Sequence, residues 1–314
     1  MKRIAILIAV LMLAVSCAAA GETVNVYALQ GPTGIGMTGV MEGNEGSYDF
    51  TLAGAPDAVT AAILSGSADI AAVPTNLAAV LYNKTNGGIR MLAVNTLGVL
   101  YILENGEEIT CAEDLAGKTI YATGQGSTPE YVLNYVLESS GIRDSVTVEY
   151  VGEHAALAAL AAEGKADIVM LPEPYVTNLM MKKDDLRIAL DMTELFNNAA
   201  AANGTPAILS MGCVIARTEF VENEPESVQA FLKAYEQSAA QVNADPAAAA
   251  RLAEKHGVMP NAGVAEMAIP NCHIVYITGE EMKNSIMPFL QVLCDADPRS
   301  VGGKMPDEDM FYLK

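Results

Sequence analysis

The chain contains the stretch Ser65-Gly-Ser-Ala-Asp-Ile-Ala-Ala-Val-Pro74, and the related stretch Glu163-Gly-Lys-Ala-Asp-Ile-Val-Met-Leu-Pro172 follows later. An alanine-rich run precedes each of them, opening at Gly54-Ala-Pro-Asp57 in the first copy and at Gly152-Glu-His-Ala155 in the second. Corresponding positions differ by a constant 98, without a net gap across some 20 residues. A repeat of this length with a fixed offset indicates that one structural unit occurs twice.

Each copy predicts a helix, a glycine turn and a buried strand. Gly66 and Gly164 end the helix where the backbone favours positive φ. The apolar runs after Asp69 and Asp167 are short and rich in Ile and Val, as strands buried on both faces are. We interpret the two aspartates as turn formers. The proline that closes each run cannot continue a central strand, so a loop follows at the strand's carboxyl end, where ligands bind in open α/β sheets.

Two glycine-rich loops follow two further predicted strands. The first strand covers residues 23–29, and the loop Gly31-Pro-Thr-Gly-Ile-Gly36 comes next. Its counterpart is Gly124-Gln-Gly-Ser-Thr-Pro-Glu130, in which Ser127 or Thr128 is expected to cap a helix. The first loop lacks the Lys-Ser/Thr of a P-loop and the full spacing of a dinucleotide motif, so nucleotide binding is not indicated. Both loops instead offer backbone N–H groups to a ligand at a helix start.

Two long apolar segments predict strands that pass between two lobes. They are residues 91–103, between the two copies, and residues 207–216, after the second copy. One lobe would then be built from both ends of the chain and the other from its middle. After Pro225 the sequence is helical, with apolar residues spaced three and four apart from Val228 to Val242.

Composition and charge exclude several kinds of partner and chemistry. The chain has 314 residues, of which 51% are hydrophobic, and its net charge of −20 repels nucleic acid and anionic lipid. It has three histidines, and its cysteines show no C-x-x-C spacing, so we expect no metal, no cofactor and no catalytic set. Cys272 and Cys294 are open to two interpretations, a disulfide or free thiols.

The N-terminus has the features of an export signal. Two basic residues precede an apolar run over residues 4–15, which is too short to span a membrane. The run ends in Leu13-Ala-Val-Ser-Cys17, which resembles a bacterial lipobox. We therefore predict a lipoprotein signal peptide over residues 1–16 and a lipid on Cys17. The alternative is ordinary cleavage after Ala20.

The exported N-terminus, the repeated half and the two crossings together resemble the solute-binding proteins of ABC importers. The most similar group binds nitrate, taurine, alkanesulfonates and thiamine-pyrimidine precursors. The resemblance covers essentially the whole mature chain and is carried by Gly31–Gly34, Gly66–Asn76, Asp114–Lys118, Leu171–Pro174 and Phe220–Phe231. It implies an α/β, two-lobe type II periplasmic-binding-protein fold, in which each lobe is an open, mainly parallel sheet flanked by helices, with a two-strand hinge. Lobe 1 would comprise residues 22–97 and 211–314, and lobe 2 residues 98–210.

The same resemblance implies a ligand site between the lobes, on the loops after the strands. The positions that match are Gly31, Pro32, Thr33, Gly34, Asp57, Thr75, Asn76, Gly124, Gln125, Ser127, Thr128, His154, Glu173 and Tyr175. Asp57 has the alternative of a helix cap, and His154 that of an exposed residue in a first helical turn. Glu173 lies between two prolines after a strand, which favours a role in the site.

The resemblance implies a small-molecule solute, an ABC permease with its ATPase, and a monomer attached to the membrane by its lipid alone. The resemblance implies that the protein is located at the outer face of the cell membrane or in the periplasm. A sulfonate-like anion would use helix N-termini and hydroxyls, whereas an aminopyrimidine or other cationic ring would use Glu173, Asp57 and Tyr175. Lys84 and Arg90 are the nearest basic residues in the sequence, which favours a neutral or basic heterocycle. The alternative function is an enzyme of pyrimidine or menaquinone-precursor synthesis on the same fold.

Overall fold

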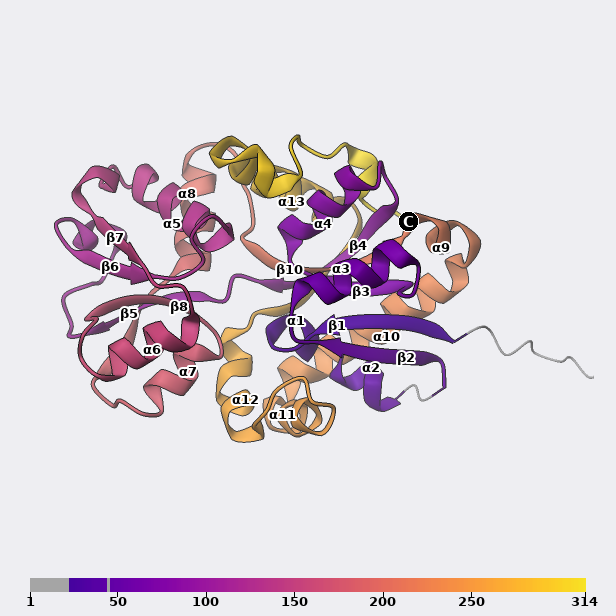
Figure 1. Ribbon diagram of the computed structural model, residues 1–314, viewed down its shortest axis with the longest axis horizontal. Coiled ribbons are helices and arrows are strands. Elements are labelled where there is room, and N and C mark those ends of the chain that lie inside the picture. The colour runs from indigo at the N-terminus through magenta and orange to yellow at the C-terminus, as the bar shows by residue number, and fades with distance from the viewer. Residues whose placement is uncertain (1–22, 44–45) are drawn as a thin grey trace, which may run out of the picture.

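The computed structural model describes residues 23–43 and 46–314 and shows an α/β chain with two β-sheets flanked by helices (Figure 1). The predicted signal peptide and Cys17 lie outside the described residues. The first sheet has the order β11-β4-β10-β3-β1-β2, with bounds Ile274–Ile277, Ile89–Leu97, Ser210–Arg217, Ile70–Val73, Val24–Leu29 and Tyr48–Ala53. The second has the order β7-β6-β8-β5-β9, with bounds Thr147–Tyr150, Thr119–Ala122, Ile168–Pro172, Leu100–Asn105 and Leu186–Asp191.

Helices cover both sheets, and they alternate with the strands along most of the chain. The α-helices are α1 (Pro32–Ile35), α2 (Thr38–Gly43), α3 (Pro56–Ser65), α4 (Thr75–Lys84), α5 (Thr128–Ser139), α6 (His154–Ala162), α7 (Tyr175–Met180), α8 (Met192–Ala202), α9 (Thr218–Asn223), α10 (Pro225–Ala244), α11 (Pro246–Lys255), α12 (Ala262–Ala268) and α13 (Gly279–Ala296). Two of the short 3-10 helices matter below, η3 (Ile269–Asn271) and η4 (Pro298–Val301).

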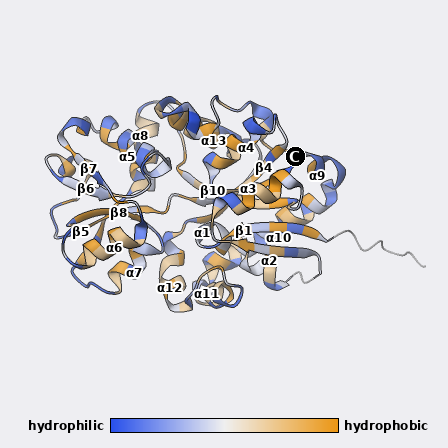
Figure 2. Cartoon of the chain, in the orientation of Figure 1, coloured by the Kyte–Doolittle hydropathy of each residue, from blue (hydrophilic) through white to orange (hydrophobic). Residues whose placement is uncertain are grey.

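The two copies of the repeat form the predicted elements. Gly66 and Gly164 follow α3 and α6 with φ of 76° and 68°, the left-handed conformation that glycine adopts without a steric penalty. The strand of the first copy, β3, is buried at all four residues. The strand of the second copy, β8, is buried at its three central residues and is largely hydrophobic (Figure 2). Helix, glycine turn and buried strand are therefore confirmed in both copies.

Most strands of each sheet run in one direction. Strand β1 is parallel to β2 and β3, and β6 is parallel to β7 and β8. The strands that arrive from the other sheet, β5 and β10, are antiparallel to their neighbours. Parallel strands end at the same edge of a sheet, so the loops after β1, β2 and β3 share one edge, called here the lobe 1 edge. The loops after β6, β7 and β8 share the lobe 2 edge.

The crossings differ in detail from the expected strands. The apolar run 91–103 is not one strand: β4 ends at Leu97 in the first sheet, and β5 begins at Leu100 in the second. The break falls at Gly98, where an added Cβ would lie 2.1 Å from Thr193 Oγ1, so only glycine fits against α8. The second crossing enters the first sheet at Ser210 rather than at Ala207. The lobe boundaries at 97/98 and 210/211 stay predictions, and we keep the names lobe 1 and lobe 2 for those ranges.

The C-terminal third is helical as predicted, and α10 buries the apolar stripe from Val228 to Val242. The cysteines among the described residues are free, and Cys272 is buried while Cys294 is half-buried. Of the two interpretations left open by the sequence, the structure therefore shows free thiols.

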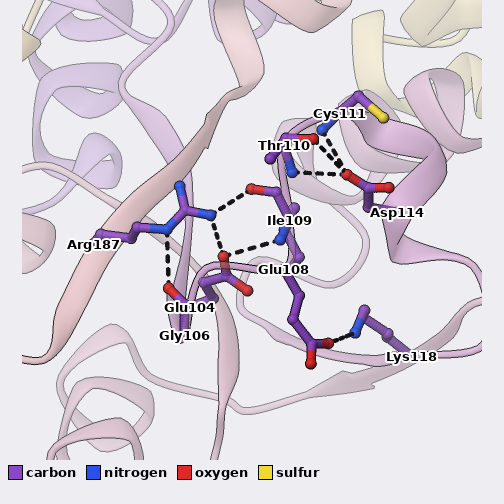
Figure 3. A network of polar contacts seen from close by, with 9 residues as sticks. All are labelled: Glu104, Gly106, Glu108, Ile109, Thr110, Cys111, Asp114, Lys118 and Arg187. Atoms are coloured by element: carbon purple, nitrogen blue, oxygen red, sulfur yellow. Dashed lines mark hydrogen bonds and ion pairs between the residues drawn. The ribbon is translucent and has the colours of Figure 1, made fainter.

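An ion-paired network lies at the start of β8, at the end of the second sheet opposite the lobe 2 edge, because Glu104 pairs with Ile168. Figure 3 shows its contacts. The buried carboxylate of Glu104 on β5 pairs with Arg187 on β9 and accepts a hydrogen bond of 3.0 Å from the Ile109 amide. Arg187 also donates to the carbonyls of Ile109, at 2.6 Å, and Gly106, at 3.0 Å. Since the buried carboxylate is both paired and hydrogen-bonded, the network holds the turn after β5 against β9.

Candidate functional site

The predicted site residues of lobe 1 follow β1, β2 and β3, and so lie along the lobe 1 edge. Pro32, Thr33 and Gly34 belong to α1, which lies on the side of lobe 1 toward lobe 2 in Figure 1. Asp57 is exposed in the first turn of α3, whose N-cap is Ala55, so Asp57 is not the cap. An acidic side chain in a first turn still interacts favourably with the positive end of the helix dipole.

The polar side chains of the α4 N-terminus already have protein partners. Thr75 is 1% exposed, and its Oγ1 lies 2.6 Å from Ser210 Oγ on the second crossing. Asn76 donates from Nδ2 to the Ser300 carbonyl at 3.2 Å. The structure thus places the Thr75 hydroxyl against β10. A direct ligand contact by either residue remains a prediction.

On lobe 2 the loop Gly124–Thr128 leads into α5 as the sequence predicts, with Ser127 as the N-cap residue. Its side chain makes no cap bond, and Ser127 Oγ donates instead to the Gly124 carbonyl at 2.6 Å. Glu130 accepts a hydrogen bond of 2.6 Å from the Gly126 amide, which fixes the loop from within the helix. Gln125 is exposed and Thr128 is buried.

A cluster of three side chains lies at the lobe 2 edge, at the ends of β6, β7 and β8. His154 Nδ1 is 2.7 Å from Thr123 Oγ1, and the ring centroids of His154 and Tyr175 are 5.1 Å apart. His154 is half-buried rather than exposed, and burial lowers its pKa below the ordinary value of 6.5. Thr123 was not among the predicted residues, although its place directly after a strand is the same signal that selected the others.

We expect His154 to make the protein sensitive to acid. Because the folded-state pKa is lowered, the unfolded chain takes up the proton first as the pH falls, and stability is lost below about pH 6.5. The His154→Gln variant lacks this titrating group, so it lacks the pH-dependent loss of stability. The melting temperature of the wild type should therefore fall more steeply than that of the variant between pH 7 and about pH 5. Parallel curves would contradict a buried neutral imidazole.

Glu173 is buried at the end of β8, with 2% of its surface exposed. Its carboxylate accepts hydrogen bonds from the Thr177 amide at 3.2 Å, from Thr177 Oγ1 at 3.0 Å and from Asn271 Nδ2 at 2.9 Å. Burial raises the pKa of Glu173, while these hydrogen bonds act in the opposite direction. The carboxylate caps α7 and reaches across to lobe 1, so it is held in place by protein donors. A ligand role for Glu173 remains a prediction.

Asn271, in η3, joins the two lobes from the lobe 1 side. Its side chain donates to Glu173, and its carbonyl accepts a hydrogen bond of 2.8 Å from the Tyr101 hydroxyl on β5. On another face of the molecule, Tyr131 on α5 donates to Asp297 at 3.3 Å and again connects the lobes. No sequence pattern around Asn271 predicts that it connects the lobes, because its partners lie far away along the chain.

A family model described as NMT1/THI5 like matches residues 49–249, well over half of the 314 residues. The chain belongs to the NMT1/THI5-like family. A comparison with curated proteins gives no significant match.

Solved structures similar to this NMT1/THI5-like chain cover nearly all of it. One is described as an ABC transporter from Parabacteroides distasonis, with 24% identity and a TM-score of 0.79 over 93% of this chain and 99% of that chain. The periplasmic aliphatic sulphonate-binding protein SsuA from Escherichia coli has 16% identity and a TM-score of 0.72, covering 93% and 92%. SsuA from Xanthomonas axonopodis, bound to MOPS, has 17% identity and a TM-score of 0.61, covering 91% and 94%. The likeness confirms the periplasmic-binding-protein fold.

Lys84 and Arg90, the basic residues nearest to the predicted site in the sequence, lie away from the lobe 1 edge of this NMT1/THI5-like protein. Lys84 is in the last turn of α4, a ten-residue helix, about 15 Å from the first turn that holds Thr75 and Asn76. Arg90 donates to the Gly87 carbonyl at 3.0 Å. None of the predicted site residues is Lys or Arg. An anion held by the predicted site residues themselves would therefore depend on backbone N–H groups and hydroxyls.

Two further findings concern only residues 23–43 and 46–314 of the NMT1/THI5-like chain. In that part, no group of three or more His, Cys, Asp and Glu side chains is arranged to hold a metal ion. Its helices include none that is both long and apolar enough to cross a membrane.

Proposed function

We propose that this NMT1/THI5-like protein is the extracytoplasmic solute-binding lipoprotein of an ABC importer. It would capture a small molecule between its lobes as a monomer and deliver it to a permease and its ATPase. One observation carries the proposal. The lobe 1 edge and the lobe 2 edge belong to separate sheets, and two crossings join these sheets. Binding between sheets at the carboxyl ends of strands is the common arrangement in open α/β folds. The two SsuA proteins of similar fold are described as binding proteins, which supports the same role here.

We further propose that the solute is a neutral or basic heterocycle, bound by the residues predicted from the sequence. The absence of Lys and Arg from those positions favours this class over a sulfonate. On the lobe 2 edge, Tyr175 offers a ring face and His154 is uncharged near neutral pH, since burial lowers its pKa. Glu173 and Asp57 supply acceptors for an amine or a ring N–H.

Mass spectrometry of the small molecule released from protein purified out of its host tests the proposal. We expect one compound in stoichiometric amount, with a nitrogen-containing ring. A released sulfonate would contradict the solute class and leave the transport role intact. A product formed from an added heterocycle during incubation would contradict the binding role itself and favour an enzyme.

Replacing Cys17 should detach the protein from the membrane. A diacyl group on this cysteine would anchor the protein firmly, since each buried CH₂ contributes about 0.8 kcal/mol. Cys17→Ser is expected to move the protein from the membrane fraction to the soluble fraction, with Ser16→Ala as a control that keeps the cysteine. Wild-type protein that is fully soluble and begins at Gly21 would contradict the lipid anchor and support ordinary cleavage.

A further inference from the structure

The chain from Asn271 to His273, called here the interlobe segment, extends from lobe 1 to three places on lobe 2. The Asn271 side chain donates to Glu173, after β8, at 2.9 Å, and the Asn271 carbonyl accepts from the Tyr101 hydroxyl, on β5, at 2.8 Å. At the third place, His273 Nε2 lies 3.9 Å from Oδ2 of Asp191, the last residue of β9. The segment therefore connects lobe 1 to three strands of the second sheet.

His273 is held against the first crossing, at the break between the two sheets. Its carbonyl accepts from the Leu97 amide at 3.1 Å, and its Nδ1 lies 2.6 Å from the Gly98 carbonyl. Its φ is 45°, in the left-handed region that residues other than glycine keep only where the surrounding contacts determine it. The imidazole is therefore fixed beside the point where the lobes join.

These contacts decide which ring nitrogen of His273 can take up a proton. A carbonyl oxygen only accepts, so the hydrogen of the neutral ring is on Nδ1, which donates to Gly98. Nε2 then carries a lone pair beside the Asp191 carboxylate, an unfavourable pair of acceptors. Protonation of Nε2 replaces this repulsion by the attraction of an ion pair. Because the pair spans the lobes, the attraction is lost when the lobes separate.

Asp191 is placed to respond to the charge of His273. Its Oδ1 accepts from the Thr193 amide at 2.7 Å as the N-cap of α8, and its other oxygen is the one beside His273. The His273 and Asp191 side chains are 30% and 28% exposed, so water screens the pair in part. The ion pair should therefore adjust the balance between open and closed lobes without fixing it.

The other titratable groups around the interlobe segment do not act in the same direction. Burial raises the pKa of Tyr101 and of Cys272, so both stay neutral between pH 5 and 8. Burial also raises the pKa of Glu173. A protonated carboxyl accepts more weakly from Asn271 than a carboxylate does. Acid acting through Glu173 would thus loosen the segment, whereas acid acting through His273 would tighten it.

We propose that the interlobe segment is a pH-dependent latch, in which a proton on His273 Nε2 strengthens the contact with Asp191 and favours the closed arrangement of the lobes. Histidine is the side chain that ordinarily changes its charge between pH 5 and 8. A proton that binds better to the closed form shifts the equilibrium toward that form. The inference rests on the proposed function, because closed lobes would retain the solute between them more strongly in acid.

The test measures the arrangement of the lobes in purified protein that has been freed of solute. Met181, at the end of α7, and Met267, on α12, are exposed, and these two helices contact each other across the lobes. Nitroxide labels on Met181→Cys and Met267→Cys should therefore move apart when the lobes open. In a background of Cys17→Ser, Cys111→Ser and Cys294→Ser, the two native thiols that remain are buried. Dipolar electron paramagnetic resonance then gives the ratio of short to long distances.

The ratio should rise about two- to fivefold between about pH 7.5 and about pH 5.5, the scale of a partly exposed ion pair. His273→Asn removes Nε2, keeps a side-chain donor for Gly98 and tolerates positive φ. Asp191→Asn removes the charge and keeps an oxygen that caps α8. Each of these two variants should abolish the rise.

His256→Gln is the matched control. His256 Nε2 lies 2.9 Å from Glu42 Oε2, and both residues belong to lobe 1, so this variant should keep the full response. The proposal is overturned if the ratio stays constant or falls in acid, if it rises equally in His273→Asn, or if short distances are absent at both pH values. The measurement uses no solute, so these results would leave the proposed binding role intact. Conversely, protein that carries no small molecule from its host would contradict that role and not the latch.

Discussion

Glu173→Leu is expected to lower the free energy of unfolding by about 3 kcal/mol or more, the scale of a broken buried polar network. The substitution leaves the Thr177 amide, the Thr177 hydroxyl and the Asn271 amide without their acceptor in a site that is 2% exposed. Chemical denaturation measures the loss. Glu107→Leu, at an exposed position, should change stability by less than about 0.5 kcal/mol. Equal losses in the two variants would contradict a structural role for the Glu173 carboxylate.

Glu173→Gln separates that structural role from the predicted ligand contact. A carboxylate has about four acceptor positions, and three protein donors occupy three of them. If the remaining one accepts an amine or ring N–H, Gln should weaken solute binding roughly 10- to 150-fold. The chain has no Trp, so thermal shift at equal solute concentration is a suitable assay. Undiminished binding would show that the carboxylate serves the fold alone, and tighter binding would favour an anionic solute.

Gly98→Ala is the second substitution with a large expected effect. The added Cβ would lie 2.1 Å from Thr193 Oγ1 and 2.8 Å from Leu209 Cδ2, in the gap between the two crossings. Overpacking of this kind costs about 1–3 kcal/mol, or more where the backbone must move. Differential scanning calorimetry should show a lower melting temperature.

Gly152→Ala is the matched control for Gly98→Ala, because an added Cβ at Gly152 has no atom within 4 Å. It should leave the melting temperature close to that of the wild type. A Gly98→Ala protein as stable as this control would show that the crossings can separate freely, contrary to the packing described above.

The repeated half of the fold was predictable because its signals are local. Gly66 and Gly164 end helices through their own backbone freedom, and the runs after Asp69 and Asp167 are too apolar to lie anywhere but in a sheet interior. Both properties belong to the residues themselves. The periodicity of α10 is local in the same way.

The break at Gly98 was not predictable, because residues 91–103 are apolar on both sides of it and a strand has the same sequence pattern in either sheet. What divides them is the packing of Gly98 on Thr193, a contact between residues far apart in sequence.

The sequence predicted which segments follow the strands and form the candidate site, but it did not predict the side-chain contacts within it. Position after a strand placed Thr75 at the strand's carboxyl end, but Thr75 begins α4 directly instead of lying in a loop, and only the tertiary structure shows its hydroxyl against Ser210. Asn271 was missed because its partners, Glu173 and Tyr101, lie on the other lobe.

The central claim is that the lobes bind solute between them and close upon it. Hinge closure about a ligand is an established form of domain motion, and the solute shifts the equilibrium by its differential affinity for the closed form. Small-angle X-ray scattering on one protein preparation, first with solute at saturation and then after its removal, measures this directly. The account predicts a smaller radius of gyration with solute bound, and an identical radius in both states would contradict it.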